Sequence, residues 1–149
     1  MNFEVKNIYA GFASTILIFA IYFTLVSGMH AAGRFDGPEG MALLGKAILA
    51  LMAGGIVVHI IMLILANILF AIIHNEPKPS FVVDERDKLI ELRGLRISYY
   101  VFGAGYVAAM IAMAMGLAAF WVFNLLLVFC ALSALMEGVV KLVLYHRGF

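Results

Sequence analysis

Long apolar runs, separated by short polar stretches, dominate the chain. Four of them are long enough to cross a bilayer, at about residues 8–29, 47–74, 97–119 and 125–145, since a spanning helix needs roughly 20 apolar residues. The first run is longer than the apolar part of a secretory signal, so we count it as a span. The pattern predicts an all-α, polytopic membrane protein in a single domain, with four transmembrane helices in a bundle of two hairpins.

The third and fourth spans come from one apolar run that must double back. Residues 97–136 include no Asp, Glu, Lys, Arg or His. One helix over this run would be about 60 Å long, twice the ~30 Å hydrocarbon core. We place the turn at residues 120–124, where Trp121 and Asn124 suit the membrane interface; a turn nearer Gly116 is the alternative.

Composition agrees with a membrane location. Hydrophobic residues make up 65% of the chain and charged residues 13%, with a mean hydropathy of +1.07, whereas a soluble domain has about 25% charged residues. The net charge of +1 argues against a nucleic-acid-binding surface, which needs clustered basic residues. With Cys130 as the single cysteine, the chain can form no internal disulfide and no cysteine-based metal site.

Lysine and arginine are shared unequally between the two sides of the membrane. With four spans, all ten of them except Arg34 and Lys46 fall on one side. The positive-inside rule therefore predicts that both termini and the charged linker at residues 75–96 lie in the cytoplasm.

The only cluster of charged residues lies at positions 83–96, between the second and third spans. Asp84 is the predicted N-cap of a helix that continues into the third span and extends it into the cytoplasm. At about 100° per residue, the acidic and basic side chains fall on opposite stripes, with leucines on one flank. The acidic stripe holds Asp84, Asp87 and Glu91 with Gly94; the basic stripe holds Arg86, Arg93 and Arg96; the flank holds Leu89, Leu92 and Leu95.

Three interpretations of this stretch stay open. Its arginines can contact lipid headgroups, although an anionic surface would repel the acidic stripe. A docked cytoplasmic protein accounts for both stripes and for the leucines. A divalent cation on Asp84, Asp87 and Glu91 is the third interpretation, although no loop cage completes such a site. The residues that we expect to bind the protein partner are Asp84, Glu85, Arg86, Asp87, Glu91, Arg93 and Arg96.

The stretch DERDKLIELRGLRISYY at residues 84–100 resembles the signature of a family of prokaryotic four-helix membrane proteins, classed as a domain of unknown function. The resemblance covers about the second half of the chain. It is carried mainly by Asp84, Glu85, Arg86, Asp87, Ile90 and Tyr100. Members of that family are often encoded beside a small helix-turn-helix regulator. The resemblance therefore implies a transcriptional regulator as partner and the inner membrane of a prokaryote as location, and it implies no catalytic residue.

Two ionisable side chains lie inside predicted spans, His59 in the second and Glu137 in the fourth. Such residues are costly in lipid and are candidates for function. Both come at a similar distance from the start of their span, so we expect them at one depth, facing the interior and interacting. The alternative for Glu137 is a local pair with Lys141, one helical turn on. The alternative for His59 is an interior histidine with a structural hydrogen bond.

The third span carries small residues at every fourth position. Such a stripe lets another helix approach closely, within the bundle or in a second copy of the chain. The stripe consists of Ala104, Ala108, Ala112 and Gly116.

Other patterns with known chemistry are missing from the sequence, which has no glycine-rich phosphate loop and no His-Glu-x-x-His. A single chain offers no two histidines at one depth for haem, so haem stays open only through His59, either from two copies of the chain or together with one of the nine methionines. We expect no enzyme, no metal and no cofactor. Ser14, Thr15, Thr24 and Asn67 are expected to form hydrogen bonds between helices.

The sequence favours a non-enzymatic membrane module that binds a cytoplasmic partner through its charged juxtamembrane helix. The alternatives are a small oligomeric transporter or channel that uses His59 and Glu137, and an accessory subunit of a larger membrane complex. The expected partners are membrane lipid, a protein in the cytoplasm or within the membrane, and a second copy of the chain. No nucleic acid is expected.

Overall fold

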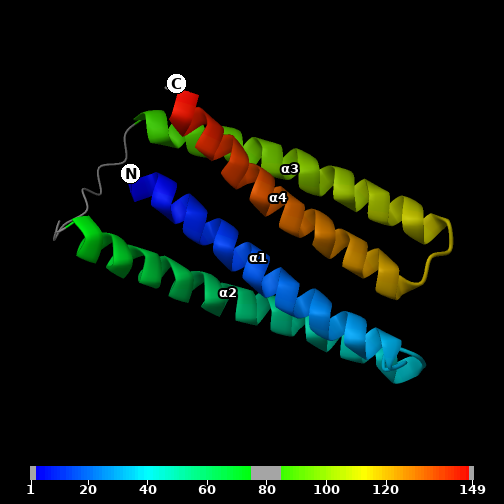
Figure 1. Ribbon diagram of the computed structural model, residues 1–149. Helices are drawn as coiled ribbons and strands as arrows, with labels where there is room; N and C mark the ends of the chain where they lie inside the picture. Colours follow the sequence, from blue (N-terminus) through cyan, green and yellow to red (C-terminus); the bar gives the residue numbers. More distant parts are fainter. Residues whose placement is uncertain (1–2, 75–84, 148–149) are drawn as a thin grey trace.

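The described residues, 3–74 and 85–147, form four helices in a computed structural model of the chain (Figure 1). They are α1 (Phe3–Ala31), α2 (Pro38–His74), α3 (Glu85–Ala114) and α4 (Ala119–Arg147). Each is long and apolar enough to cross a membrane. The fold is all-α and the protein is an integral membrane protein, as the apolar runs predict.

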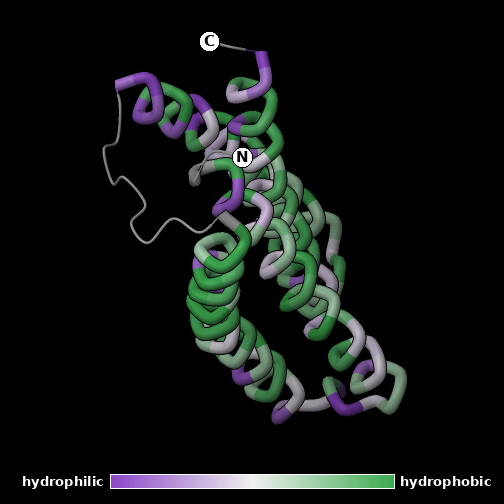
Figure 2. Tube along the Cα trace, turned by 60° about the vertical axis from the view of Figure 1, so that its left-hand side comes forward, coloured by the Kyte–Doolittle hydropathy of each residue, from purple (hydrophilic) through white to green (hydrophobic). Residues whose placement is uncertain are grey.

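Neighbouring helices lie in the order α2, α1, α4, α3. Helix α1 packs on α2, α3 on α4, and α1 on α4, so the two hairpins meet through α1 and α4 (Figure 1). The starts of α1 and α3 and the end of α4 lie at one end of the bundle. Figure 2 shows hydrophilic residues mainly near the helix ends, while the lengths between them are mostly hydrophobic.

Helices α1 and α2 extend beyond the predicted spans 8–29 and 47–74. Helix α2 begins at Pro38 and has 37 residues, which makes it about 55 Å long. Proline suits the first turn of a helix, and Gly33 and Gly37 form the preceding turn with φ of 68° and 75°. Hydropathy locates the apolar part of each helix, whereas the turn residues set its ends.

The charged stretch and the third span form one continuous helix, as predicted. Helix α3 begins at Glu85, and Glu85 and Asp87 occupy its first turn, where carboxylates interact favourably with the helix dipole. The predicted N-cap, Asp84, lies outside the described residues.

The turn between α3 and α4 lies at residues 115–118, so its predicted place at 120–124 is wrong and the alternative near Gly116 is correct. The N–H of Leu117 bonds to the C=O of Ala112 at 3.1 Å, and the N–H of Gly116 to the C=O of Met113 at 3.0 Å. These bonds form a Schellman motif, which needs a residue in the left-handed region. Gly116, with φ of 81°, provides it, so Trp121 falls inside α4.

Small residues let α3 approach α4 closely. A side chain at Gly105 would overlap Phe129 of α4. Its neighbour along the same face, Ala109, is fully buried. Close backbone approach of this kind stabilises helix pairs in membranes, where lipid is as apolar as the helices themselves. The buried positions of α3 are Ile90, Gly94, Gly105, Ala109 and Ala112.

The predicted stripe of small residues matches this face only in part. Ala112 is buried and Ala108 half-buried, but Ala104 and Gly116 are exposed. Four residues turn an α-helix by about 400°, so a strict four-residue spacing drifts by about 40° per step and about 120° over three steps. The ends of such a stripe therefore leave the packed face.

Candidate functional site

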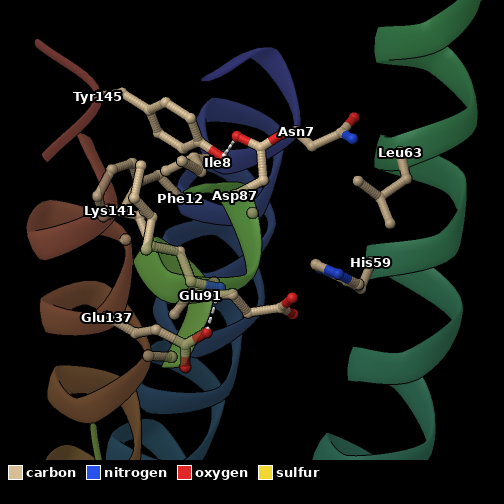
Figure 3. A pocket seen from close by; sticks show the side chains of 15 residues that line it. Asn7, Ile8, Phe12, His59, Leu63, Asp87, Glu91, Glu137, Lys141 and Tyr145 are labelled. Atoms are coloured by element: carbon tan, nitrogen blue, oxygen red, sulfur yellow. Dashed lines mark hydrogen bonds and ion pairs between the residues drawn. The ribbon is translucent and has the colours of Figure 1, made fainter. Parts of the chain in front are cut away.

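A polar cleft of about 570 Å³ lies among all four helices, at the end of the bundle where α3 starts and α4 ends. Every helix contributes polar side chains to it (Figure 3). They are Asn7 and Thr15 of α1, His59 of α2, Asp87 and Glu91 of α3, and Glu137, Lys141 and Tyr145 of α4. The cleft thus unites two candidate groups from distant parts of the sequence, the charged stretch and the two ionisable residues within spans.

Glu137 pairs with Lys141, one turn further along α4. The Lys141 Nζ lies 2.6 Å from the Glu137 Oε1, and the two side chains are only 18% and 26% exposed. A hydrogen bond between ionised groups is roughly twice as strong as one between neutral groups. Gly94 of α3 makes room for this pair, since a Cβ there would lie 2.8 Å from Cγ of Lys141.

His59 forms a hydrogen bond across to α1. Its Nδ1 lies 2.8 Å from Oγ of the buried Ser14. Ser14 donates its single hydroxyl hydrogen to the carbonyl of Gly11 at 2.9 Å, so the Nδ1 of His59 is the donor toward Ser14.

His59 and Glu137 both line the cleft, yet they do not form the predicted pair. Among the described residues, each has a different partner and no hydrogen bond or ion pair joins the two. The local pair of Glu137 with Lys141 is the alternative that the structure contains. The helices bring His59 and Glu137 to opposite sides of the cleft.

Glu91 occupies this space between the two sides of the cleft. Its carboxylate extends from α3 toward the side where His59 lies (Figure 3). It forms no hydrogen bond or ion pair within the described part of the chain. One turn earlier, Asp87 accepts a hydrogen bond of 3.0 Å from the Tyr145 hydroxyl of α4, which fixes the start of α3 against the end of α4.

The cleft is negatively charged. Its ionised side chains are the carboxylates of Asp87, Glu91 and Glu137 and the ammonium of Lys141, which leaves a net charge of about −2 when His59 is neutral. The apolar helices around it lower the effective dielectric constant and strengthen the attraction for a cation. The arrangement can therefore bind a cation.

The divalent-cation interpretation of the charged stretch has no complete ligand set among the described residues. Within residues 3–74 and 85–147, no three His, Cys, Asp or Glu side chains come together as metal ligands. The predicted set also needs Asp84, which lies outside these residues.

The predicted docking stretch is divided between the cleft and the outer surface. Asp87 and Glu91 line the cleft, although Glu91 is itself exposed; Glu85, Arg93 and Arg96 are exposed and do not line it. Arg86 is half-buried, and its Nε has no hydrogen-bond partner in the described part of the chain. The outer surface of the first turns of α3 therefore carries charges of both signs together with exposed leucines.

Several polar contacts between helices depend on residues that the sequence does not single out. Lys6 is buried on α1, donates a hydrogen bond to Asn67 of α2, and lies 4.9 Å above the ring of Phe70. Ser14 and Asn67 thus form the predicted interhelical bonds, while Thr24 bonds within its own helix. No local pattern marks Lys6 or Tyr145, because their roles depend on which helices meet.

The resemblance of the charged stretch to the four-helix family of unknown function stays a prediction after comparison with known proteins. The function of the chain is therefore inferred from the geometry of the cleft. No protein-family model matches the chain, and no curated protein and no solved structure matches it.

Proposed function

We propose that the protein is a non-enzymatic membrane protein of the transporter or channel type, whose four-helix cleft binds a small organic cation. One observation carries this proposal: Asp87 and Glu91 of the charged stretch, His59 and Glu137 all line a single cleft within an apolar framework. Its volume of about 570 Å³ falls in the range of roughly 300–1,000 Å³ that small-molecule sites have.

The apolar part of the lining supports an organic cation. Ile8 and Phe12 of α1, Leu63 of α2 and the fully buried Ile90 of α3 share the cleft with the carboxylates. A ligand with an ammonium group and an apolar body would satisfy both kinds of surface, since carboxylates bind the charge and apolar side chains the body.

Benzylammonium is a suitable probe, with uncharged benzyl alcohol as a control of the same shape. The purified protein should unfold at higher temperature as benzylammonium is added, because a ligand that binds only the folded state stabilises it. Benzyl alcohol should give no such increase. Glu91→Gln should weaken benzylammonium binding about 10-fold, or ~1.4 kcal/mol.

The control variant is Glu39→Gln, which removes an exposed carboxylate at the start of α2, outside the cleft. It should bind benzylammonium as the unaltered protein does. Equal stabilisation by the two probes, or equal affinity in Glu91→Gln, would contradict a cation site at this cleft.

A second candidate function is the docking of a cytoplasmic protein on the outer surface of α3. It is favoured by the exposure of Leu89, Leu92 and Leu95, at 50%, 60% and 40%, in a segment that precedes the predicted span. Leu92→Glu should then release a protein that co-purifies with the chain, while Glu91→Gln, on the cleft side, should retain it. Retention in both variants would count against docking at this surface.

We also propose that both termini lie in the cytoplasm of a prokaryotic cell and that the apolar outer faces contact membrane lipid. The excess of lysine and arginine at one end of the bundle supports this orientation. Alkaline phosphatase should be inactive when fused to the C-terminal end and active when inserted at the turn around Gly37. The reverse pattern would invert the topology.

A further inference from the structure

A second pocket, of about 500 Å³, lies between α1 and α4 at the opposite end of the bundle from the cleft. Its walls include Phe23 and Val26 of α1 and Phe120 and Trp121 of α4. None of the described residues that line it is an Asp, Glu, Lys or Arg. The lining therefore favours an uncharged ligand, because it offers an ion no counter-charge.

Aromatic rings give the pocket a flat wall. The imidazole of His30 stacks on Phe120, with ring centroids 4.0 Å apart and planes inclined by 10°. The indole of Trp121 stands edge-on to both rings, with centroids 5.3 Å and 5.1 Å away. Aromatic groups pack well in offset or edge-on arrangements, so this wall favours a ring-containing ligand over a flexible chain.

Two residues that line the pocket, one on α1 and one on α4, each have a buried polar atom with no hydrogen-bond partner among the described residues. Asn124 is only 8% exposed; its Nδ2 donates to the carbonyl of Phe120 at 2.8 Å, whereas its Oδ1 has no partner among the described residues. The Nδ1 of His30 is likewise buried and unpartnered in that part of the chain. Buried polar atoms are nearly always hydrogen-bonded, and a side-chain carbonyl oxygen can only accept, so Asn124 calls for a donor from a ligand.

We propose that this pocket binds an uncharged aromatic alcohol of the phenol class. The hydroxyl donates a hydrogen bond to Oδ1 of Asn124, the ring lies against Phe120 and Trp121, and His30 offers a second polar contact from α1. This site is independent of the cleft and of the cation proposed there.

The single tryptophan of the chain, Trp121, provides a direct readout, because bromine quenches tryptophan fluorescence on contact. The probe is 4-bromophenol, and bromobenzene is the control without a hydroxyl. With the purified protein at constant detergent concentration, 4-bromophenol should quench Trp121 to saturation. Asn124→Leu should weaken this binding about 5-fold, as expected for one lost hydrogen bond, and leave quenching by bromobenzene unchanged.

Two further variants make the test decisive. Ser133→Ala removes a buried hydroxyl of α4 that does not line the pocket and should change neither probe. His30→Phe keeps a ring against Phe120 but removes both ring nitrogens, so it should weaken 4-bromophenol alone even if Asn124→Leu fails to fold.

Three results would overturn the proposal. One is equal affinity for 4-bromophenol in the unaltered protein, Asn124→Leu and His30→Phe. Another is quenching that increases without saturation, which indicates partition into detergent only. The third concerns a lipid with brominated acyl chains. If this lipid quenches Trp121 and added 4-bromophenol does not displace it, a lipid occupies the pocket.

Discussion

Leucine in place of Gly105 should force α3 away from α4 and lower the free energy of unfolding by roughly 1–3 kcal/mol, the range found for overpacked interiors. A Cβ at Gly105 would overlap both the Cβ and the ring of Phe129. The ring could rotate aside, but the Cβ of Phe129 is attached directly to the backbone. The two helices must therefore separate, along the closest interface of the bundle.

Gly103→Leu is the matched control for this variant. Gly103 lies on the same helix, and a Cβ there would meet nothing within 4 Å, while the change in helix propensity is the same. Unfolding by dodecyl sulfate, followed by helical circular dichroism, should show a loss for Gly105→Leu and none for Gly103→Leu. A similar loss in both would mean that α3 and α4 do not meet at Gly105.

Methionine in place of Lys141 should also destabilise the protein, because it leaves the Glu137 carboxylate without its partner. Removing one member of a fully buried ion pair costs about 3–5 kcal/mol. Since Glu137 is 26% exposed, water can solvate part of the charge, and we expect a loss of roughly 1–3 kcal/mol. The same unfolding measurement would detect it.

The double variant Glu137→Gln with Lys141→Met separates the ion pair from simple packing. It removes both charges, so it should recover most of the stability that Lys141→Met loses. Lys46→Met, at an exposed lysine of α2, should have little effect. If the double variant is no more stable than Lys141→Met, the unpaired carboxylate is not the cause of the loss.

The helices of this protein can be predicted from hydropathy, because each segment that crosses lipid must be apolar and must satisfy its own backbone hydrogen bonds. The same holds for the continuous helix through the charged stretch, where the acids at Glu85 and Asp87 suit a helix start. The turn at Gly116 is less predictable from the sequence. An interfacial residue such as Trp121 indicates the membrane boundary only approximately, whereas a glycine that can adopt positive φ indicates the helix end itself.

The site is less predictable, because it depends on how the hairpins pack. The helical wheel of α3 separates Asp87 and Glu91 from the arginines, but it cannot show that these two carboxylates share a cleft with residues of the other three helices. Helix directions likewise predict a common level for His59 and Glu137 without fixing the space between them. A local partner at i+4, Lys141, was available from the sequence and is the one that Glu137 uses.

The most direct test of the account is whether the cleft is open to water and occupied by a cation. Thr15 lines the cleft, whereas Thr24, on the same helix, is exposed outside it. In a Cys130→Ser background in proteoliposomes, Thr15→Cys should react with a charged methanethiosulfonate reagent much faster than Thr24→Cys. Benzylammonium should slow that reaction, benzyl alcohol should not, and Glu91→Gln should remove the protection. A cysteine at position 15 that reacts no faster than one at position 24, or that benzylammonium does not protect, would contradict a cation-binding cleft.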